Sequence, residues 1–262
     1  MAIEYYAHTR ENPETGLIEY QTVEQHLRGT AELCAEFADK LNAKEYGELV
    51  GSLHDYGKCT REFLNRILNS GPRVDHSTAG AIICAKKDHV FLAACIAGHH
   101  SGLPDFGNMY ADTADSHTLF GRIKKGISKK YVEKCGDSGV PMPDVKPYME
   151  KNLLFASQWT RMMFSCETDA DFLDTERFVK GAIGRGGYDS IETLYERLNK
   201  YVERWSNPQT ELNKLRWQIL CACKEAGGLK KGIYTLTVPT GGGKTIASLA
   251  FALSHALKHN MD

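Results

Sequence analysis

The chain has 262 residues, 42% of them hydrophobic and 25% charged, and a formal net charge of −1. At about 150 residues per domain, this length predicts one large domain, or one domain and part of another, and the balanced charge gives no global sign of nucleic-acid binding. No apolar run approaches the roughly 20 residues that span a bilayer, and the N-terminus lacks the features of a signal peptide. We therefore expect a cytoplasmic protein with no membrane partner.

The eight cysteines are scattered and form no Cys-x-x-Cys pair, which argues against a zinc or redox site built from them. Several lie among small apolar residues, so we expect reduced thiols in the core. They are Cys34, Cys59, Cys84, Cys95, Cys135, Cys166, Cys221 and Cys223.

Apolar residues spaced three to four apart predict a run of helices through the first two thirds of the chain. The predicted helices cover residues 22–42, 46–56, a segment capped by Thr60, about 76–87, 90–100 and 152–180. Residues 101–151 are rich in glycine, proline and polar residues, apart from a basic helical piece near 117–134, and are expected to be a long insertion rather than core. One more helix is predicted up to Trp205, with Asp189 and Glu192 as its capping box.

Histidines and aspartates recur in or beside these helices, where all of them can point into one shared interior. They are His26, His54, Asp55, His76, His99, His100 and Asp171. Nitrogen and oxygen ligands of this kind suit a pair of divalent metal ions. Two such ions can activate a water and neutralise phosphoryl oxygens, which favours phosphodiester hydrolysis.

Within the series, the adjacent His54 and Asp55 are the natural centre, with Asp55 bridging both ions. Lys58 lies one helical turn on and is expected to contact a substrate phosphate rather than a metal, while Gly57 is expected to end the helix. A lone histidine on an apolar face is more often a hydrogen-bonded core residue than a ligand, but an ordered series of this length is hard to obtain by chance. The other histidines, at positions 8, 89, 117, 255 and 259, are interpreted as surface or structural residues.

The series resembles the HD superfamily of metal-dependent phosphohydrolases, and in its longer form the HD nuclease domain of the CRISPR-associated nuclease-helicase of type I systems. His54-Asp55-Tyr56-Gly57-Lys58 is similar to that family's His-Asp-x-Gly-Lys element, and Ala170-Asp171-Phe172-Leu173 to its late Ala-Asp-aromatic element. The resemblance covers about residues 20–180 and implies an all-α HD-superfamily helical bundle.

The resemblance also implies two ligand sets that share Asp55. One metal would take His26, His54, Asp55 and Asp171, and the other Asp55, His76, His99 and His100. Asp169 and Asp171 diverge by about 200° on a helix, so only one should face the site, and the family pattern favours Asp171. Imidazole-rich coordination favours a transition metal such as Mn, Ni, Co or Fe over Mg.

The pattern changes near residue 233, where residues 233–238 predict a strand and residues 239–245 a phosphate-binding loop that leads into a helix over 246–257. Val238 replaces the first glycine of the general P-loop, which resembles the superfamily 2 helicase form, and the Arg216-Trp217-Gln218 segment resembles the adenine-recognition segment of such helicases. The expected ATP-binding residues are Thr240, Gly241, Gly243, Lys244 and Thr245.

The predicted domains are therefore an HD nuclease domain at 1–206, with the insertion, and a linker and truncated start of a RecA-like helicase domain at 207–262. ATP and Mg are expected to bind only in a full-length helicase, because this short α/β segment offers its strand no neighbours. The chain itself is expected to lack ATPase and helicase activity, and residues after about 232 to be poorly ordered or opportunistically packed.

The leading functional hypothesis is a metal-dependent nuclease that cleaves single-stranded DNA, delivered in the full-length protein by an RNA-guided surveillance complex and fed by the helicase. The main alternative is an HD phosphohydrolase that acts on nucleotides or cyclic nucleotides with the same ligands. The basic run from Arg122 to Lys134 mildly favours a polymer, although such runs are usually a solvated face. A recruitment module with a vestigial site is disfavoured, because every ligand position holds a competent residue.

Overall fold

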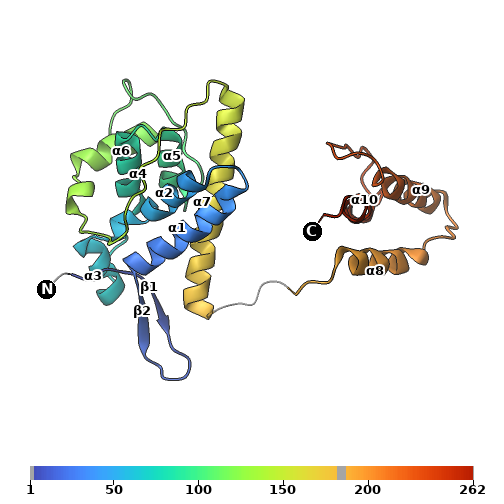
Figure 1. Cartoon of the computed structure of the whole chain (residues 1–262), viewed down its shortest axis with the longest axis horizontal. Helices are drawn as coiled ribbons and strands as arrows, with labels where there is room; N and C mark the ends of the chain where they lie inside the picture. The colour runs from blue at the N-terminus through green and yellow to red at the C-terminus, as the bar shows by residue number, and fades with distance from the viewer. Residues whose placement is uncertain (1–2, 182–186, 262) are drawn as a thin grey trace. The chain divides into compact units, whose positions relative to one another are not determined.

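The computed structural model describes residues 3–181 and 187–261 and divides into two compact units, residues 1–183 and residues 184–262. The N-terminal unit is a helical bundle, as the sequence predicts, with one β-hairpin (Figure 1). Its elements are β1 (Tyr6–Glu11), β2 (Ile18–Thr22), α1 (Val23–Asp39), α2 (Lys44–Leu53), the 3-10 helix η1 (Tyr56–Lys58), α3 (Arg61–Asn69), α4 (Ser77–Lys86), α5 (Val90–Gly98), α6 (Leu119–Ser128), the 3-10 helix η2 (Val132–Lys134) and α7 (Leu153–Lys180).

The helices begin where the sequence offers caps. A capping box between Thr22 and Gln25 starts α1, and the Thr60 hydroxyl accepts from the backbone N–H of Phe63 to start α3. α1 and α2 cross closely, because a Cβ on Gly51 would lie 2.5 Å from the Cα of Ala31. Buried residues of α1, α2, α4, α5 and α7 form the main core, and the long α7 runs along this bundle (Figure 1). The packing fixes the helices that carry the predicted ligands.

Gly57 has a different role from the expected one. α2 ends at Leu53, and Gly57 lies in η1, where its N–H donates to the His76 carbonyl oxygen at 2.9 Å. A Cβ on Gly57 would lie 2.4 Å from that oxygen and 2.6 Å from the His76 Cα. The glycine is needed for close approach of two backbones and not to end a helix.

Gly57→Ala is accordingly expected to push η1 and the His76 segment apart. Forcing one extra methyl group into a packed core costs about 1–3 kcal/mol, so thermal or denaturant unfolding should show a clear loss of stability. Gly16→Ala is the matched comparison for a glycine with open space, since nothing lies within 4 Å of its Cβ position, although its φ of +67° adds backbone strain. Equal stability of Gly57→Ala and the wild type would contradict the close packing.

Residues 101–151 are not the peripheral insertion that the sequence predicted. Leu119, Ile123 and Val145 are buried in the main core, and Leu103 and Phe106 pack against it. α6 packs on α4 and α5. The glycine and proline content hid these apolar anchors, which are too widely spaced to give a periodic signal.

The N-terminal hairpin was missed by the sequence analysis, which found no strand before residue 233. β1 and β2 pair antiparallel, with Arg10 opposite Glu19 and a register shift between Tyr6 and His8. The turn is closed by the Asn12 side chain, which accepts from the N–H groups of Glu14 and Thr15. The bulge at the start of β1 re-aims the strand beside the helical bundle.

The C-terminal unit contains α8 (Ile191–Glu203), α9 (Glu211–Ala226) and α10 (Lys244–His259). These helices share a small core, made of Leu198, Val202, Leu220, Ala250 and Leu253. The predicted boundary at 206/207 therefore differs from the observed division at 183/184, which groups α8 with the C-terminal helices. Ser190, rather than Asp189, caps α8, and Asp189 pairs with Arg197 at 2.6 Å.

The predicted strand at 233–238 is not formed, although all of these residues are described. A lone strand has no partner for its backbone groups in this unit, which explains the difference. Of the two expectations for the residues after about 232, poor order is wrong for α10, because this helix packs on α8 and α9. In the loop, Gly241 and Gly243 have φ near +80°, and Lys244 Nζ donates to the Val238 carbonyl at 3.1 Å.

Five of the cysteines are buried in the core as expected, at positions 34, 59, 84, 95 and 166. Cys135 and Cys223 are partly exposed and Cys221 is exposed, so the expectation of core thiols is wrong for Cys221. All eight lie in the described part of the chain, and all are free. In residues 3–181 and 187–261, no helix combines the length and apolar character that a membrane span requires.

Candidate metal centre

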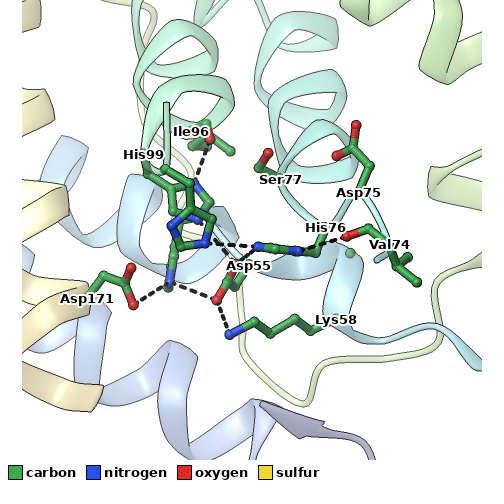
Figure 2. Close-up of polar contacts among 12 residues, drawn as sticks. Asp55, Lys58, Val74, Asp75, His76, Ser77, Ile96, His99 and Asp171 are labelled. Atoms are coloured by element: carbon green, nitrogen blue, oxygen red, sulfur yellow. Dashed lines mark hydrogen bonds and ion pairs between the residues drawn. The ribbon is translucent and has the colours of Figure 1, made fainter. Parts of the chain in front are cut away.

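The Asp55 carboxylate lies at the centre of the predicted ligands (Figure 2). Asp55 follows the end of α2 and precedes η1, and its side chain is fully buried. Its Oδ2 lies 3.2 Å from His26 Nε2 and 3.4 Å from His54 Nε2. Its Oδ1 lies 3.5 Å from His76 Nε2 and 3.4 Å from His99 Nε2. The two oxygens thus face two different groups of imidazoles.

Asp171 and His100 complete the two groups. Asp171 Oδ1 lies 3.3 Å from His26 Nε2 and 3.6 Å from His54 Nε2. His100 Nε2 lies 3.0 Å from His76 Nε2. All seven residues of the predicted series are therefore brought together, and four of them, Asp55, His76, His99 and His100, form one compact group of potential metal ligands.

The imidazoles are oriented by their second ring nitrogen. The Nδ1–H groups of His54, His76 and His99 donate to the carbonyl oxygens of Gly51, Val74 and Ile96 at 2.8, 3.1 and 2.8 Å. A carbonyl oxygen can only accept, so Nδ1 carries a proton, and in the neutral ring Nε2 presents a lone pair to the centre. Such outer hydrogen bonds fix the tautomer of metal-ligating histidines.

His26 has the corresponding arrangement with a carboxylate. Its Nδ1 lies 2.8 Å from Asp174 Oδ2, which also accepts from the Gln21 side chain at 2.7 Å. The sequence analysis did not identify Asp174 or Gln21. The available signal for Asp174 was its place three residues after Asp171, on the same helix face.

The choice between the two aspartates of α7 follows from their placement. Asp171 reaches His26 and His54, whereas Asp169 is exposed. Residues two apart on a helix point in nearly opposite directions. The structure therefore brings Asp171, and not Asp169, to the ligand groups.

His8 is a member of the centre that the sequence analysis interpreted as a surface or structural residue. It lies in β1, and with His26, Asp55 and Asp171 it forms the second compact group of potential ligands. Its Nε2 accepts from Lys58 Nζ at 3.0 Å. The useful signal was the strand itself, since a histidine in a hairpin next to α1 can reach His26, whose ring centroid lies 4.6 Å away.

Lys58 points into this same region (Figure 2). Its buried ammonium lies 2.6 Å from Asp55 Oδ2, so it supplies a positive charge on the side of Asp55 that also faces His26. An ammonium in this place satisfies the carboxylate when no metal does.

The ligand groups fit divalent metal ions. Donor atoms bound tetrahedrally to one ion with bonds of about 2.1 Å lie about 3.4 Å apart, which is the range of the distances around Asp55. Among the described residues, the buried atoms Asp55 Oδ1 and His99 Nε2 have no hydrogen-bond partner. Buried polar atoms are normally satisfied, so a cation between these two atoms accounts for both.

The charges of the centre favour a cation as well. Burial opposes ionisation of Asp55, yet Lys58 and His54 beside it hold the pKa of this carboxyl well below its ordinary value. Burial likewise opposes ionisation of Asp171, but hydrogen bonds from His26 and His54 lower its pKa. Burial and the nearby Lys58 lower the pKa of His8 to about 3, so this imidazole is neutral and free to act as a ligand. Carboxylates and imidazoles are the donors that transition metals prefer. The same carboxylates raise the pKa of His26, His54 and His99 despite burial, so a bound cation would displace protons from these rings.

Glu167 is a buried acid near the centre that the sequence analysis also missed. It lies on α7, one turn before Asp171, and both carboxyl oxygens are buried without a hydrogen-bond partner in the described part of the chain. Burial raises the pKa of Glu167 to about 8, although His99 and His54 lower it. Glu167 is therefore protonated at neutral pH when no metal is bound.

This shift predicts a pH dependence of stability for the metal-free protein. The pKa of Glu167 is higher in the folded state than in the unfolded state, so its contribution is fully present below about pH 4.5 and is lost as pH rises through about 8. Each pKa unit corresponds to about 1.4 kcal/mol. Denaturant unfolding in chelator should show a steeper loss of stability between pH 5 and 8 for the wild type than for Glu167→Gln. Parallel pH profiles would contradict the buried neutral acid.

Comparison with known families gives a match to part of this chain. Residues 23–127 match the family model of the HD domain. The segment that matches the HD domain includes the predicted ligands from His26 to His100. A search of the curated proteins finds no match. HD domains belong to a superfamily of metal-dependent phosphohydrolases and nucleases. The chain combines the match to this family with a His/Asp cluster that could hold a metal ion. Three further residues lie in the same cluster: Asp171, His8 and Lys58. Lys58 lies inside the matched segment, whereas Asp171 and His8 lie outside it.

Proposed function

We propose that this chain is a metal-dependent phosphodiesterase that cleaves single-stranded DNA, similar to the nuclease of the type I CRISPR nuclease-helicase. The observation that carries the proposal is the shared carboxylate, because each oxygen of Asp55 faces a different group of imidazoles. A carboxylate that bridges two ions is typical of centres that hydrolyse phosphodiesters. His26, His54 and Asp171, with His8 adjacent, would hold one ion, and His76, His99 and His100 the other.

The residues of the chain have distinct tasks in this proposal. Bound divalent ions would lower the pKa of a water and neutralise phosphoryl oxygens. The imidazoles are held by Gly51, Val74 and Ile96 so that their Nε2 atoms need little reorganisation. Asp174 orients His26 in the same way. The Lys58 ammonium lies against the Asp55 carboxylate when no metal is present. A metal bound at Asp55 would displace this ammonium, which could then contact a phosphate oxygen of the substrate.

The substrate class can be tested with the purified chain. We would incubate it with single-stranded DNA, duplex DNA, nucleotides and cyclic nucleotides, each with Mn²⁺, Ni²⁺, Co²⁺ or Mg²⁺ and with chelator. The proposal predicts cleavage of single-stranded DNA that depends on a transition metal. Hydrolysis of nucleotides alone would favour the smaller-substrate phosphohydrolase, and no hydrolysis under any condition would contradict an enzymatic role.

Lys58→Met separates a phosphate contact from a metal ligand. Loss of one positioned electrostatic donor typically slows an enzyme about 100-fold, so cleavage should fall by that order. Metal content should remain unchanged or metal affinity should rise, because the ammonium that lies 2.6 Å from Asp55 Oδ2 competes with a cation. Metal analysis and cleavage rates are measured on the same preparation. A variant that binds fewer ions than the wild type would show that the assigned role is wrong.

We further propose that residues 239–245 belong to a nucleotide-binding loop of a superfamily 2 helicase that supplies single-stranded DNA to this centre, with an RNA-guided surveillance complex as the partner that delivers the target. In support, the loop has two glycines with positive φ ahead of the helix α10, as a phosphate-binding loop requires. Lys244, at the first position of α10, contacts the loop's own Val238 carbonyl when no phosphate is bound.

A further inference from the structure

Arg122 on α6 connects the two segments of chain that carry His76, His99 and His100. Its Nε–H donates to Thr78 Oγ1 at 2.6 Å, and its Nη2 donates to Ser77 Oγ at 2.6 Å and to Asp75 Oδ1 at 3.2 Å. Its Nη1 donates to the carbonyl oxygen of Ala97. All three guanidinium nitrogens are therefore engaged, and none of these partners is itself a candidate ligand.

The first segment surrounds His76. Asp75 accepts from the backbone N–H of Thr78 at 3.0 Å and from its hydroxyl at 2.7 Å, which forms the turn that starts α4. His76 lies inside this turn, with its Nδ1–H on the Val74 carbonyl. Figure 2 shows Asp75 and Ser77 on either side of the His76 backbone. Arg122 contacts three of the four residues from Asp75 to Thr78.

The second segment is the last turn of α5. Carbonyl groups there have no intrahelical partner, and a cation at this end of a helix is favourable. Arg122 satisfies the Ala97 carbonyl, two residues before His99, whose own Nδ1–H is bonded to the Ile96 carbonyl. The Arg122 guanidinium therefore joins the turn that carries His76 to the end of α5 that carries His99 and His100. The separation of these histidines depends on this link.

The packing of α6 supports this role independently. A Cβ on Gly126, one turn after Arg122, would lie 2.6 Å from Thr78 Cγ2 and 2.7 Å from Ile82 Cδ1. α6 therefore approaches α4 as closely as a glycine allows, which holds Arg122 against the His76 turn. A lysine could not replace the guanidinium, because its single ammonium cannot reach two segments in a fixed fork.

We propose that Arg122 is a positioning residue that sets the geometry of the metal group formed by Asp55, His76, His99 and His100. The inference rests on the proposed metal-dependent function and extends it, because it assigns α6 a role in one of the two ion sites and not in the other. Among the described residues, the hydrogen bonds of Arg122 go to the segments of His76 and of His99, and not to the elements that carry His26, His54 and Asp171.

The test is site-selective metal binding by the full chain. Co²⁺ is titrated into metal-free wild type, Arg122→Gln, Arg122→Lys and His100→Ala, and followed by calorimetry and by visible absorption. Changes in the outer partners of a metal site typically weaken metal affinity about 10–100-fold. Arg122→Gln should weaken one of the two binding steps by this amount and reduce the same absorption band that His100→Ala reduces. Arg122→Lys should show the same change, and Lys125→Gln, an exposed cation on α6, should bind as the wild type does.

The outcomes separate the two proposals. Two ions of unchanged affinity in Arg122→Gln, or equal weakening of both steps, would overturn the positioning role while leaving the metal-dependent function in place. A wild type that binds no ion would overturn the proposed function, and the inference with it. If Arg122→Gln does not fold, Arg122→Lys and Asp75→Asn carry the same comparison, because each breaks part of the network and keeps the size of the side chain.

Discussion

Asp55→Asn is expected to lose metal-dependent cleavage by about 1,000-fold or more, since even an outer partner of a metal site is worth about 10–100-fold. Among the residues that the structure describes, Asp55 is the one that belongs to both groups of potential ligands. An asparagine keeps the shape of the side chain but removes the charge and the second anionic oxygen that a bridge requires. Both ions should bind more weakly, which metal analysis after dialysis will show together with the cleavage rates.

The same substitution has a cost for folding that has to be separated from catalysis. Asp55 and Lys58 form a buried ion pair at 2.6 Å, and breaking one partner of such a pair typically costs about 3–5 kcal/mol. Asp55→Asn with Lys58→Met removes both charges and should recover stability without recovering activity. Substantial cleavage by a folded, metal-loaded Asp55→Asn protein would contradict the bridging role.

Asp171→Asn is expected to lower cleavage about 100-fold or more, because it removes a ligand of one ion, while its neighbour Asp169→Asn should leave activity within about two-fold of the wild type. The two aspartates differ by two positions on α7, but only Asp171 lies within 3.6 Å of His26 and His54. This matched pair makes the same chemical change on the same helix. Cleavage assays and metal titration would contradict the assignment if Asp169→Asn were the impaired variant.

The placement of the helical members of the His/Asp series could be predicted from sequence because their positions follow local rules. His26 falls on the buried stripe of an amphipathic helix, and His99 and His100 lie where α5 ends, so that adjacent residues can serve one centre. The helix period also identified the two aspartates of α7 as alternatives. Asp171 was favoured by family resemblance, and the structure supports that choice with distances.

The missed residues depend on contacts between distant parts of the chain. His8 comes from a short hairpin with a bulge, whose pattern of alternation is too weak to detect in six residues. Asp174 matters only because α7 brings it to His26, 148 positions away in the sequence. A glutamate on a helix is expected from sequence to face solvent or to bind a ligand. Only the packing of α7 shows that Glu167 is buried.

The organisation of the chain was harder to predict than its site. Residues 101–151 lack periodicity, yet α6 contributes to the core and brings Arg122 to the ends of α4 and α5. The strand predicted at 233–238 has the right composition, but the described part of the chain offers it no neighbouring strand to pair with. In both places tertiary contacts, which a local pattern does not contain, decide the structure.

We propose that one carboxylate serves two ions, and crystals of the protein soaked with Mn²⁺ test this most directly. Anomalous difference maps should show two ions about 3.5–4 Å apart, one on each side of the Asp55 carboxylate. One should contact His26 and Asp171, and the other His76 and His99. A single ion that Asp55 does not share, or no ion within reach of Asp55, would contradict the account.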